Sequence, residues 1–208
     1  MEYESNIYDF ELNNFFENKK VADKSIKINE KIINKYNNLL FKSIRNFSEI
    51  ADIELKINEQ IRIITNKNMN AISLIALYTK KYIFTEMYIA VYRMNSFTAK
   101  WLINFIKANE NTNVNIIISN FFRANKNYQQ WAEYIYNSSL ENKNLNAKFV
   151  NNHAKIFLGQ TKCNKHIVFE GSGNLSDNAR IEQYMLEDNQ EVYNFHKSWM
   201  LKILCKTI

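Results

Sequence analysis

Apolar residues recur along this chain with two different periods, and the change of period marks the predicted elements. From Ser25 onward the spacing is helical, because Ile28, Ile32, Tyr36 and Leu39 fall on one side of an amphipathic helix. We expect this helix to pack against a core or a partner rather than to carry chemistry. It is the main element predicted in the first quarter of the chain.

Short strands alternate with helices in the rest of the chain. Apolar and charged residues alternate over 53–57, which predicts a strand or a hairpin arm. Further strands are predicted at 61–64, 82–92, 114–119, 147–150, 153–158, 166–170 and 180–186, and helices at 70–79, 96–106, 128–135 and 190–203. Ser96 is the predicted N-cap of its helix. The nearly all-apolar segment 114–119 is typical of a strand buried on both faces.

This alternation predicts an α/β fold, in which a layered mixed β-sheet is flanked by helices. We divide the chain into an N-terminal helical appendage, residues 1–59, and a domain, residues 60–208. Charge divides at the same place, since the first part has 9 Lys and Arg against 11 Asp and Glu, and the second 18 against 10. A basic domain favours a polyanionic partner. A solvated lysine surface explains the charge equally well.

All three glycines of the chain, Gly159, Gly171 and Gly173, lie between Asn152 and Glu182. Glycine is needed where a backbone turns tightly or comes close to a ligand. The rest of this sequence has no glycine. The stretch is therefore a candidate site before any family is considered.

Two predicted strands within this stretch bring polar groups to one end of a sheet. His153 and Lys155 share one face of the first strand, while the apolar residues between and after them take the other. The second strand runs directly into the loop Gly171-Ser172-Gly173-Asn174. An imidazole, an ammonium group, a hydroxyl, an amide and backbone N–H groups would meet there. Such groups suit a phosphate.

The pattern His153-x-Lys155 followed by Gly171-Ser172-x-Asn174 resembles the HxK…GSxN half-motif of the phospholipase D superfamily. The resemblance implies that His153 attacks phosphorus and becomes a phosphohistidine. It implies that Lys155 and Asn174 hold phosphate oxygens and that Ser172 supports the loop. The fold that it implies is the same α/β fold with a mixed sheet.

The resemblance also implies a role for one residue beyond the loop and for a second subunit. Glu182 would be the acid that orients the nucleophile. Arg180 is predicted, from its place just past the glycines, to contact backbone phosphates together with Gly171 and Gly173. No metal or cofactor is expected. The chain has one half-motif where a complete site needs two, so a homodimer is predicted with the site at its two-fold axis.

The predicted function is that of a metal-independent phosphodiesterase, a nuclease of bacterial or phage origin acting on nucleic acid. Two alternatives stay open. The family usually has an Asp five residues after the Lys, and Gln160 stands there in this chain, which keeps open a non-catalytic nucleic-acid binder on the same scaffold. A phospholipid headgroup hydrolase or transferase is the other alternative.

Cysteine usage and hydropathy bear on the compartment. Two cysteines, Cys163 and Cys205, favour a reducing environment without a disulfide framework. The N-terminus is acidic and polar, unlike a signal peptide, and the apolar stretch 71–78 is too short to span a bilayer. These features predict a cytoplasmic protein, with membrane association not expected.

Four further candidates have a structural explanation that competes with the functional one. Glu86 lies in an apolar strand, where a carboxylate needs a partner, and is placed either at the phosphate site or at a sheet end or surface. His196 is predicted to be packed or exposed rather than catalytic. His166 has no other candidate residue at a spacing that would indicate a shared site. Residues 121–123, Phe-Phe-Arg, are predicted to pack in the core, with base stacking as the alternative.

Overall fold

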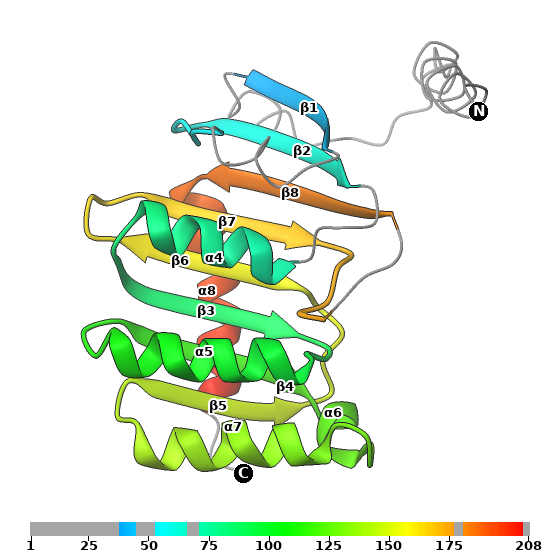
Figure 1. The fold of residues 1–208 in the computed structure, drawn as a ribbon. Helices are drawn as coiled ribbons and strands as arrows, with labels where there is room; N and C mark the ends of the chain where they lie inside the picture. The colour runs from blue at the N-terminus through cyan, green and yellow to red at the C-terminus, as the bar shows by residue number, and fades with distance from the viewer. Residues whose placement is uncertain (1–37, 45–52, 66–70, 177–180, 206–208) are drawn as a thin grey trace, which may run out of the picture. The chain divides into compact units, whose positions relative to one another are not determined.

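The fold is known from a computed structural model that describes residues 38–44, 53–65, 71–176 and 181–205 (Figure 1). Its strands are β1 (Asn38–Ile44), β2 (Glu59–Thr65), β3 (Phe84–Val91), β4 (Asn113–Ser119), β5 (Leu145–Val150), β6 (Ile156–Thr161), β7 (His166–Gly171) and β8 (Glu182–Asp188). Its helices are α4 (Ala71–Lys81), α5 (Ser96–Ala108), α6 (Asn120–Ala124), α7 (Gln129–Glu141) and α8 (Gln190–Leu204). The predicted α/β fold is confirmed.

One eight-stranded mixed sheet organises the described residues, in the order β1-β2-β8-β7-β6-β3-β4-β5. Strands β3, β4 and β5 are parallel, β6 is antiparallel to β3, and β7 and β8 continue the alternation. The C-terminal ends of β3, β4, β5 and β7 therefore meet the starts of β6 and β8 at one edge. We call it the α6 edge, because α6 lies there (Figure 1).

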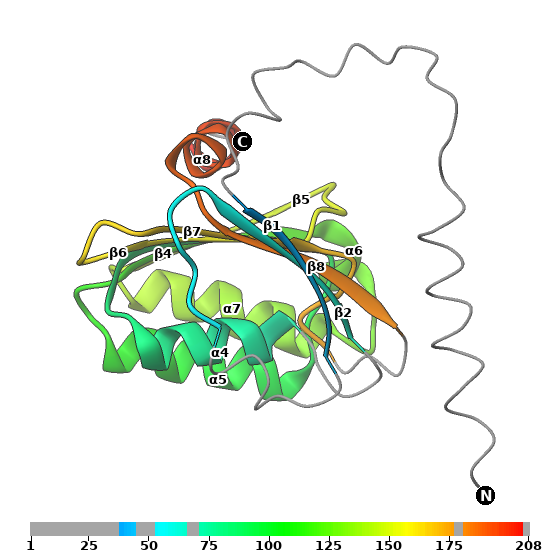
Figure 2. The ribbon, with the colours of Figure 1, turned by 90° about the horizontal axis from the view of Figure 1, so that it is seen from above.

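Helices cover the two faces of the sheet unequally. Figure 2 shows α4, α5 and α7 on one face and α8 alone on the other. Neighbouring residues of a strand point to opposite faces, so Met87 belongs to the larger core under the three helices and Tyr88 to the smaller core under α8. Leu158 and Val168 also pack against α8. None of the helices among the described residues is long and apolar enough to cross a membrane.

The structure corrects the prediction for the N-terminal part. Leu39 lies in β1, which pairs in parallel with β2, and not in a helix; the start of the predicted helix, 25–37, lies outside the described residues. An open strand edge offers unpaired backbone groups, and β1 satisfies those of β2. The sheet therefore begins before residue 59. Segment 53–57 is no strand; within it, Ile57 makes an isolated bridge to Asp188.

Most other elements lie where the sequence predicts them, with differences at the ends. Asn95, not Ser96, caps α5, because the Asn95 side chain accepts a hydrogen bond from Thr98 N at 2.9 Å. Strand β6 begins at Ile156, so His153 and Lys155 precede the strand rather than lie in it. Because His153 and Lys155 lie outside the strand, their backbone groups and side chains can make contacts other than strand pairing.

Candidate active site

Six strand ends bring the candidate residues together at the α6 edge. Because the carboxyl ends of neighbouring strands in such sheets form the usual ligand crevice, this edge is where a site is expected. The contributing residues are Tyr92 and Arg93 after β3, Phe121 after β4, His153 and Lys155 between β5 and β6, Ser172 to Asn174 after β7, and Glu182 at the start of β8.

The segment that carries His153 is tied to the end of β3. Asn152 donates its side-chain N–H to the Val91 carbonyl at 3.0 Å, and its side-chain oxygen accepts from Ala154 N at 3.0 Å. The Lys155 ammonium lies 3.2 Å from His153 Nδ1 and donates to the His153 carbonyl at 2.8 Å. When Nδ1 accepts the Lys155 bond, a neutral His153 ring carries its proton on Nε2.

The Lys155 ammonium group makes no hydrogen bond to a carboxylate among the described residues. Partial burial lowers the pKa of the Lys155 ammonium, because it removes water from the charge; the Glu182 carboxylate opposes this lowering, and repulsion from Arg93 adds to it. A partly buried ammonium group favours an anionic ligand, since the negative charge of the ligand would compensate for the water that burial removed.

The loop after β7 is fastened to its neighbours by backbone and side-chain bonds. Gly171 N donates to the Lys155 carbonyl at 3.2 Å, and Ser172 N donates to the Gln183 carbonyl at 3.0 Å. The Ser172 hydroxyl donates to the Glu182 carboxylate and accepts from Gln183 N. Glu182 therefore braces the loop through Ser172. Its predicted contact with His153 is not among the contacts of the described residues.

Gly171 is required by close packing rather than by a turn. No described glycine has a positive φ. A Cβ on Gly171 would lie 2.4 Å from Cδ1 of Tyr184 and 2.6 Å from the Gln183 carbonyl oxygen. Because the Gln183 contact is with backbone, a side chain at this position would push the loop away from β8.

A pocket lies beside this loop. Its lining includes Lys155, Gly171 and Gly173, with apolar residues such as Leu74 and Ile75 of α4 below them. In the same loop, the side-chain oxygen of Asn174 is buried without a hydrogen-bond partner among the described residues. Three of the predicted phosphate-binding residues thus line one pocket, whereas Arg180 lies outside the described residues.

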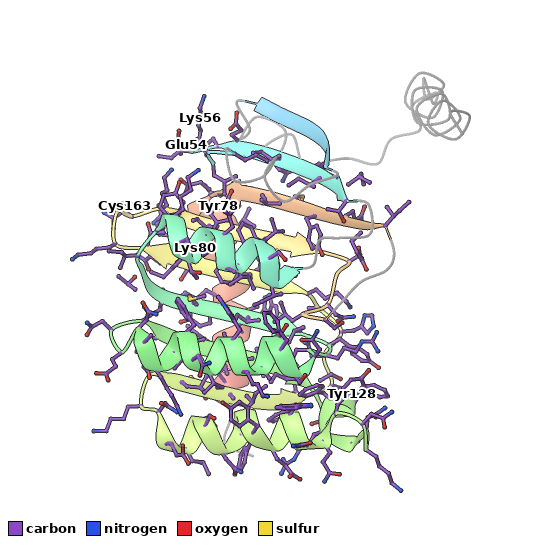
Figure 3. All side chains as sticks on the ribbon, viewed as in Figure 1. Glu54, Lys56, Tyr78, Lys80, Tyr128 and Cys163 are labelled. Carbon is purple, nitrogen blue, oxygen red and sulfur yellow. The ribbon has the colours of Figure 1, made fainter. Side chains whose placement is uncertain are left out.

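Sequence reasoning missed the two residues that follow β3. The Tyr92 ring lies 4.7 Å from the His153 ring between centroids, and Lys155 Nζ lies 5.7 Å from the Tyr92 ring centroid. Arg93 donates to the Tyr128 hydroxyl at 3.3 Å, and Figure 3 shows Tyr128 near α6. The sequence could have indicated both residues, because they follow directly after a buried strand and ligand sites are common at such strand ends.

Three of the four candidates with a competing structural explanation lie on the α8 side of the sheet: Glu86, His166 and His196. Glu86 accepts hydrogen bonds from Tyr193 at 2.7 Å and Tyr88 at 3.2 Å and pairs with Lys197. His196 Nε2 lies 2.9 Å from Glu170, and the His166 ring contacts the ring of Tyr193. These contacts anchor α8, so Glu86, His166 and His196 have structural partners. No group of three metal-ligating side chains occurs among the described residues.

Comparison with known proteins finds relatives by fold. No family model and no curated protein sequence matches the chain. Among solved structures, the phospholipase D family member Nuc from Salmonella typhimurium matches with a TM-score of 0.52 and 15% identity, over 70% of this chain and 94% of that one. Polyphosphate kinase from Porphyromonas gingivalis matches with a TM-score of 0.54 and 12% identity, over 75% of this chain and 28% of that one.

NucT from Helicobacter pylori is also similar, with a TM-score of 0.48 and 21% identity over 70% of this chain and 96% of that one. At these identities the comparisons concern the fold. The mixed sheet with helices on both faces is similar to the fold of Nuc, in agreement with the α/β fold that the half-motif predicts.

Proposed function

We propose that this protein is a metal-independent phosphodiesterase acting on nucleic acid, with His153 as its nucleophile. One observation carries the proposal: the Lys155 ammonium lies 3.2 Å from His153 Nδ1, on a segment that Gly171 of the loop contacts. A nucleophile, a cation and a loop of hydrogen-bond donors are thus gathered at one sheet edge. The likeness of the fold to Nuc, a phospholipase D family member, supports the proposal because the half-motif resembles that of the same superfamily.

The proposed reaction proceeds by two displacements at phosphorus. In the first, a His153 ring nitrogen forms a bond to phosphorus, and the bond from phosphorus to the leaving oxygen breaks. In the second, water attacks phosphorus and the phosphorus–nitrogen bond breaks, which frees His153. Lys155 and Asn174 would hold the non-bridging oxygens, where charge grows in the transition state. Ser172, braced by Glu182, would keep the loop in place.

The leaving oxygen needs a proton, and a second His153 would provide it. A histidine that acts as a general acid is an imidazolium, protonated on both ring nitrogens, so this second His153 would give one proton to the leaving oxygen. The neutral ring that remains would take a proton from the attacking water in the second displacement. The nucleophile needs a free lone pair on its attacking nitrogen, so one histidine cannot do both at once. We infer a two-fold dimer in which the His153 side chains of the two subunits face each other.

The position that differs from the family pattern lies away from this chemistry. Gln160 is near the far end of β6, opposite Glu86 and His166 in the register. It is four positions along the chain from Ile156 at the start of that strand, a span of roughly 13 Å at the usual rise. We infer that Gln160 does not contact the reacting phosphate, which favours the enzyme over the non-catalytic binder.

The decisive experiment is cleavage in the presence of a chelator. Purified protein is incubated in EDTA with plasmid, single-stranded DNA, RNA and a chromogenic phosphodiester. We expect cleavage, and a covalent phosphohistidine at position 153 detected by mass spectrometry. Activity that appears only with Mg²⁺ would overturn the mechanism, and nucleic-acid binding without any cleavage would establish the non-catalytic alternative.

The other alternative and the dimer have their own tests. Binding to phospholipid vesicles together with no binding to oligonucleotides at low salt would favour the phospholipid enzyme. Light scattering at micromolar concentration should find a dimer, and a monomer alone would exclude the shared site. His166→Ala is the matched histidine control, since the His166 ring contacts Tyr193 on the face covered by α8.

A further inference from the structure

Two adjacent phenylalanines at the start of α6 have opposite environments. Phe122 is fully buried, and its ring stacks on Tyr128 with 5.7 Å between centroids. Phe121 is 42% exposed. Its position is fixed, because its backbone N–H donates to the Ser119 hydroxyl that caps α6. The prediction of core packing for this pair is therefore right for Phe122 and wrong for Phe121.

The exposed ring belongs to a row of rings that leads to the candidate nucleophile. Phe121 and Tyr92 are stacked, with 5.1 Å between centroids and 13° between their planes. Tyr92 in turn contacts the ring of His153. A single exposed phenylalanine would be ordinary, but this one is held parallel to a second ring that touches the site.

Positive charge lies beside Tyr92 of this row and on α6. Lys155 lies next to Tyr92 and is close enough to Arg93 for the two charges to repel each other. On α6 itself, the guanidinium group of Arg123 lies over the rings of Tyr136 and Phe149, at 5.3 and 5.7 Å. The Glu182 carboxylate also acts on Lys155. Flat rings among cations suit a ligand with both flat faces and phosphates.

We propose that Phe121, supported by Tyr92, is a stacking site for an unpaired nucleobase beside the phosphate at His153. The substrate class is then single-stranded nucleic acid, which deepens and rests on the proposed function. In a duplex each base already stacks on its neighbours, whereas an unpaired base can place its face on an aromatic ring. Stacking accepts every base, so the site selects strandedness rather than sequence.

Fluorescence anisotropy tests the stacking site with three probes: an oligothymidylate, an abasic oligomer of the same length and a duplex. We expect the wild-type protein to bind the oligothymidylate about tenfold or more tightly than the abasic oligomer, as is typical of one stacked base. Phe121→Ala and Phe121→Leu should remove that preference, while Phe121→Tyr should keep it. Phe195→Ala, which removes a ring 67% exposed on α8, should keep it too.

The outcomes separate this inference from the proposed function. Equal binding of oligothymidylate and abasic oligomer would overturn the stacking site, even if the chromogenic phosphodiester is cleaved. A preference that depends on Phe121 without any cleavage would support the stacking site and refute the phosphodiesterase. Light scattering of Phe121→Ala completes the test, because conversion of a dimer to a monomer would assign Phe121 to the subunit contact and overturn the proposal.

Discussion

Lys155 and Lys165 flank the same strand, β6, yet among the described residues only Lys165 is hydrogen-bonded to a carboxylate. Lys155 precedes β6 at the α6 edge, and Lys165 closes the turn at the opposite edge, where Figure 3 shows Cys163. Lys165 donates to Asp188 at 3.1 Å and to the Leu55 carbonyl at 2.8 Å. Lys155 donates to groups of the neighbouring His153.

The pKa values of the two ammonium groups shift in opposite directions. Burial alone lowers the pKa of each, and for Lys165 the hydrogen bond and the charge of Asp188 more than reverse this effect. For Lys155 burial prevails, although Glu182 opposes it. A lysine whose role is structural has its partner within the fold. A lysine without a hydrogen-bonded carboxylate among the described residues, at the end of a strand, indicates a partner that comes from outside.

The largest expected effect is a difference in turnover between variants of Lys155 and of Lys165. Lys155→Ala and His153→Ala should each lower turnover by at least ~10²–10³, which is the usual loss for one oriented donor in the transition state. Lys165→Ala should retain turnover at a temperature where circular dichroism shows it folded. The assay is chromogenic phosphodiester hydrolysis. Equal activity of Lys155→Ala and the wild type would remove Lys155 from the site.

The free energy of unfolding should show the reverse order, with the larger loss for a change at the Lys165–Asp188 pair than for one at Lys155. Asp188 is 3% exposed and accepts from Lys165 and from His166 N. Asp188→Asn should cost about 2–4 kcal/mol, because it leaves a partly buried cation without its counter-charge. Lys155→Met should leave the free energy of unfolding unchanged or raise it by up to about 1 kcal/mol. Urea denaturation measures both, and a larger loss for Lys155→Met would contradict the comparison.

The two lysines should also respond to pH with opposite sign. The folded pKa of Lys165 is raised, so its stabilising contribution is full below the unfolded value near ~10.4 and is lost as pH rises through the folded pKa. The folded pKa of Lys155 is lowered, so its contribution to stability rises with pH between the folded pKa and the unfolded value. Acetic anhydride labelling read by mass spectrometry should show Lys155 reacting at lower pH than Lys165.

The smallest effect concerns the dependence of binding on salt. With on the order of four to eight phosphate contacts in a dimer, log K should fall with log salt at a slope of roughly −3 to −7. Lys155→Ala should make the slope shallower by about 0.7 to 0.9 per contact removed, whereas Lys165→Ala should not change it. Anisotropy of a labelled oligonucleotide measures the slope, and an unchanged slope in Lys155→Ala would show that Lys155 meets no phosphate.

The fold followed from local patterns over most of the domain. Helices such as α5 could be predicted because their apolar residues recur with the helical period, and β4 because a short run of apolar residues is typical of a strand buried on both faces. Strand β1 could not, because it exists through pairing with β2, a contact that no local period encodes. The helical spacing that includes Leu39 was therefore misleading.

The sequence by itself determined which groups belong to the candidate site: His153, Lys155 and the loop from Gly171 to Asn174 follow from their spacing alone. Only the tertiary structure decided what surrounds them. It placed Tyr92 beside His153 and Phe121 against Tyr92, because parallel strands end at the same edge, and it joined Lys165 to Asp188. It also left Lys155 without such a partner among the described residues. Residue spacing encodes a short motif, whereas pairing of charges and stacking of rings depend on strand order, which the chain establishes only on folding.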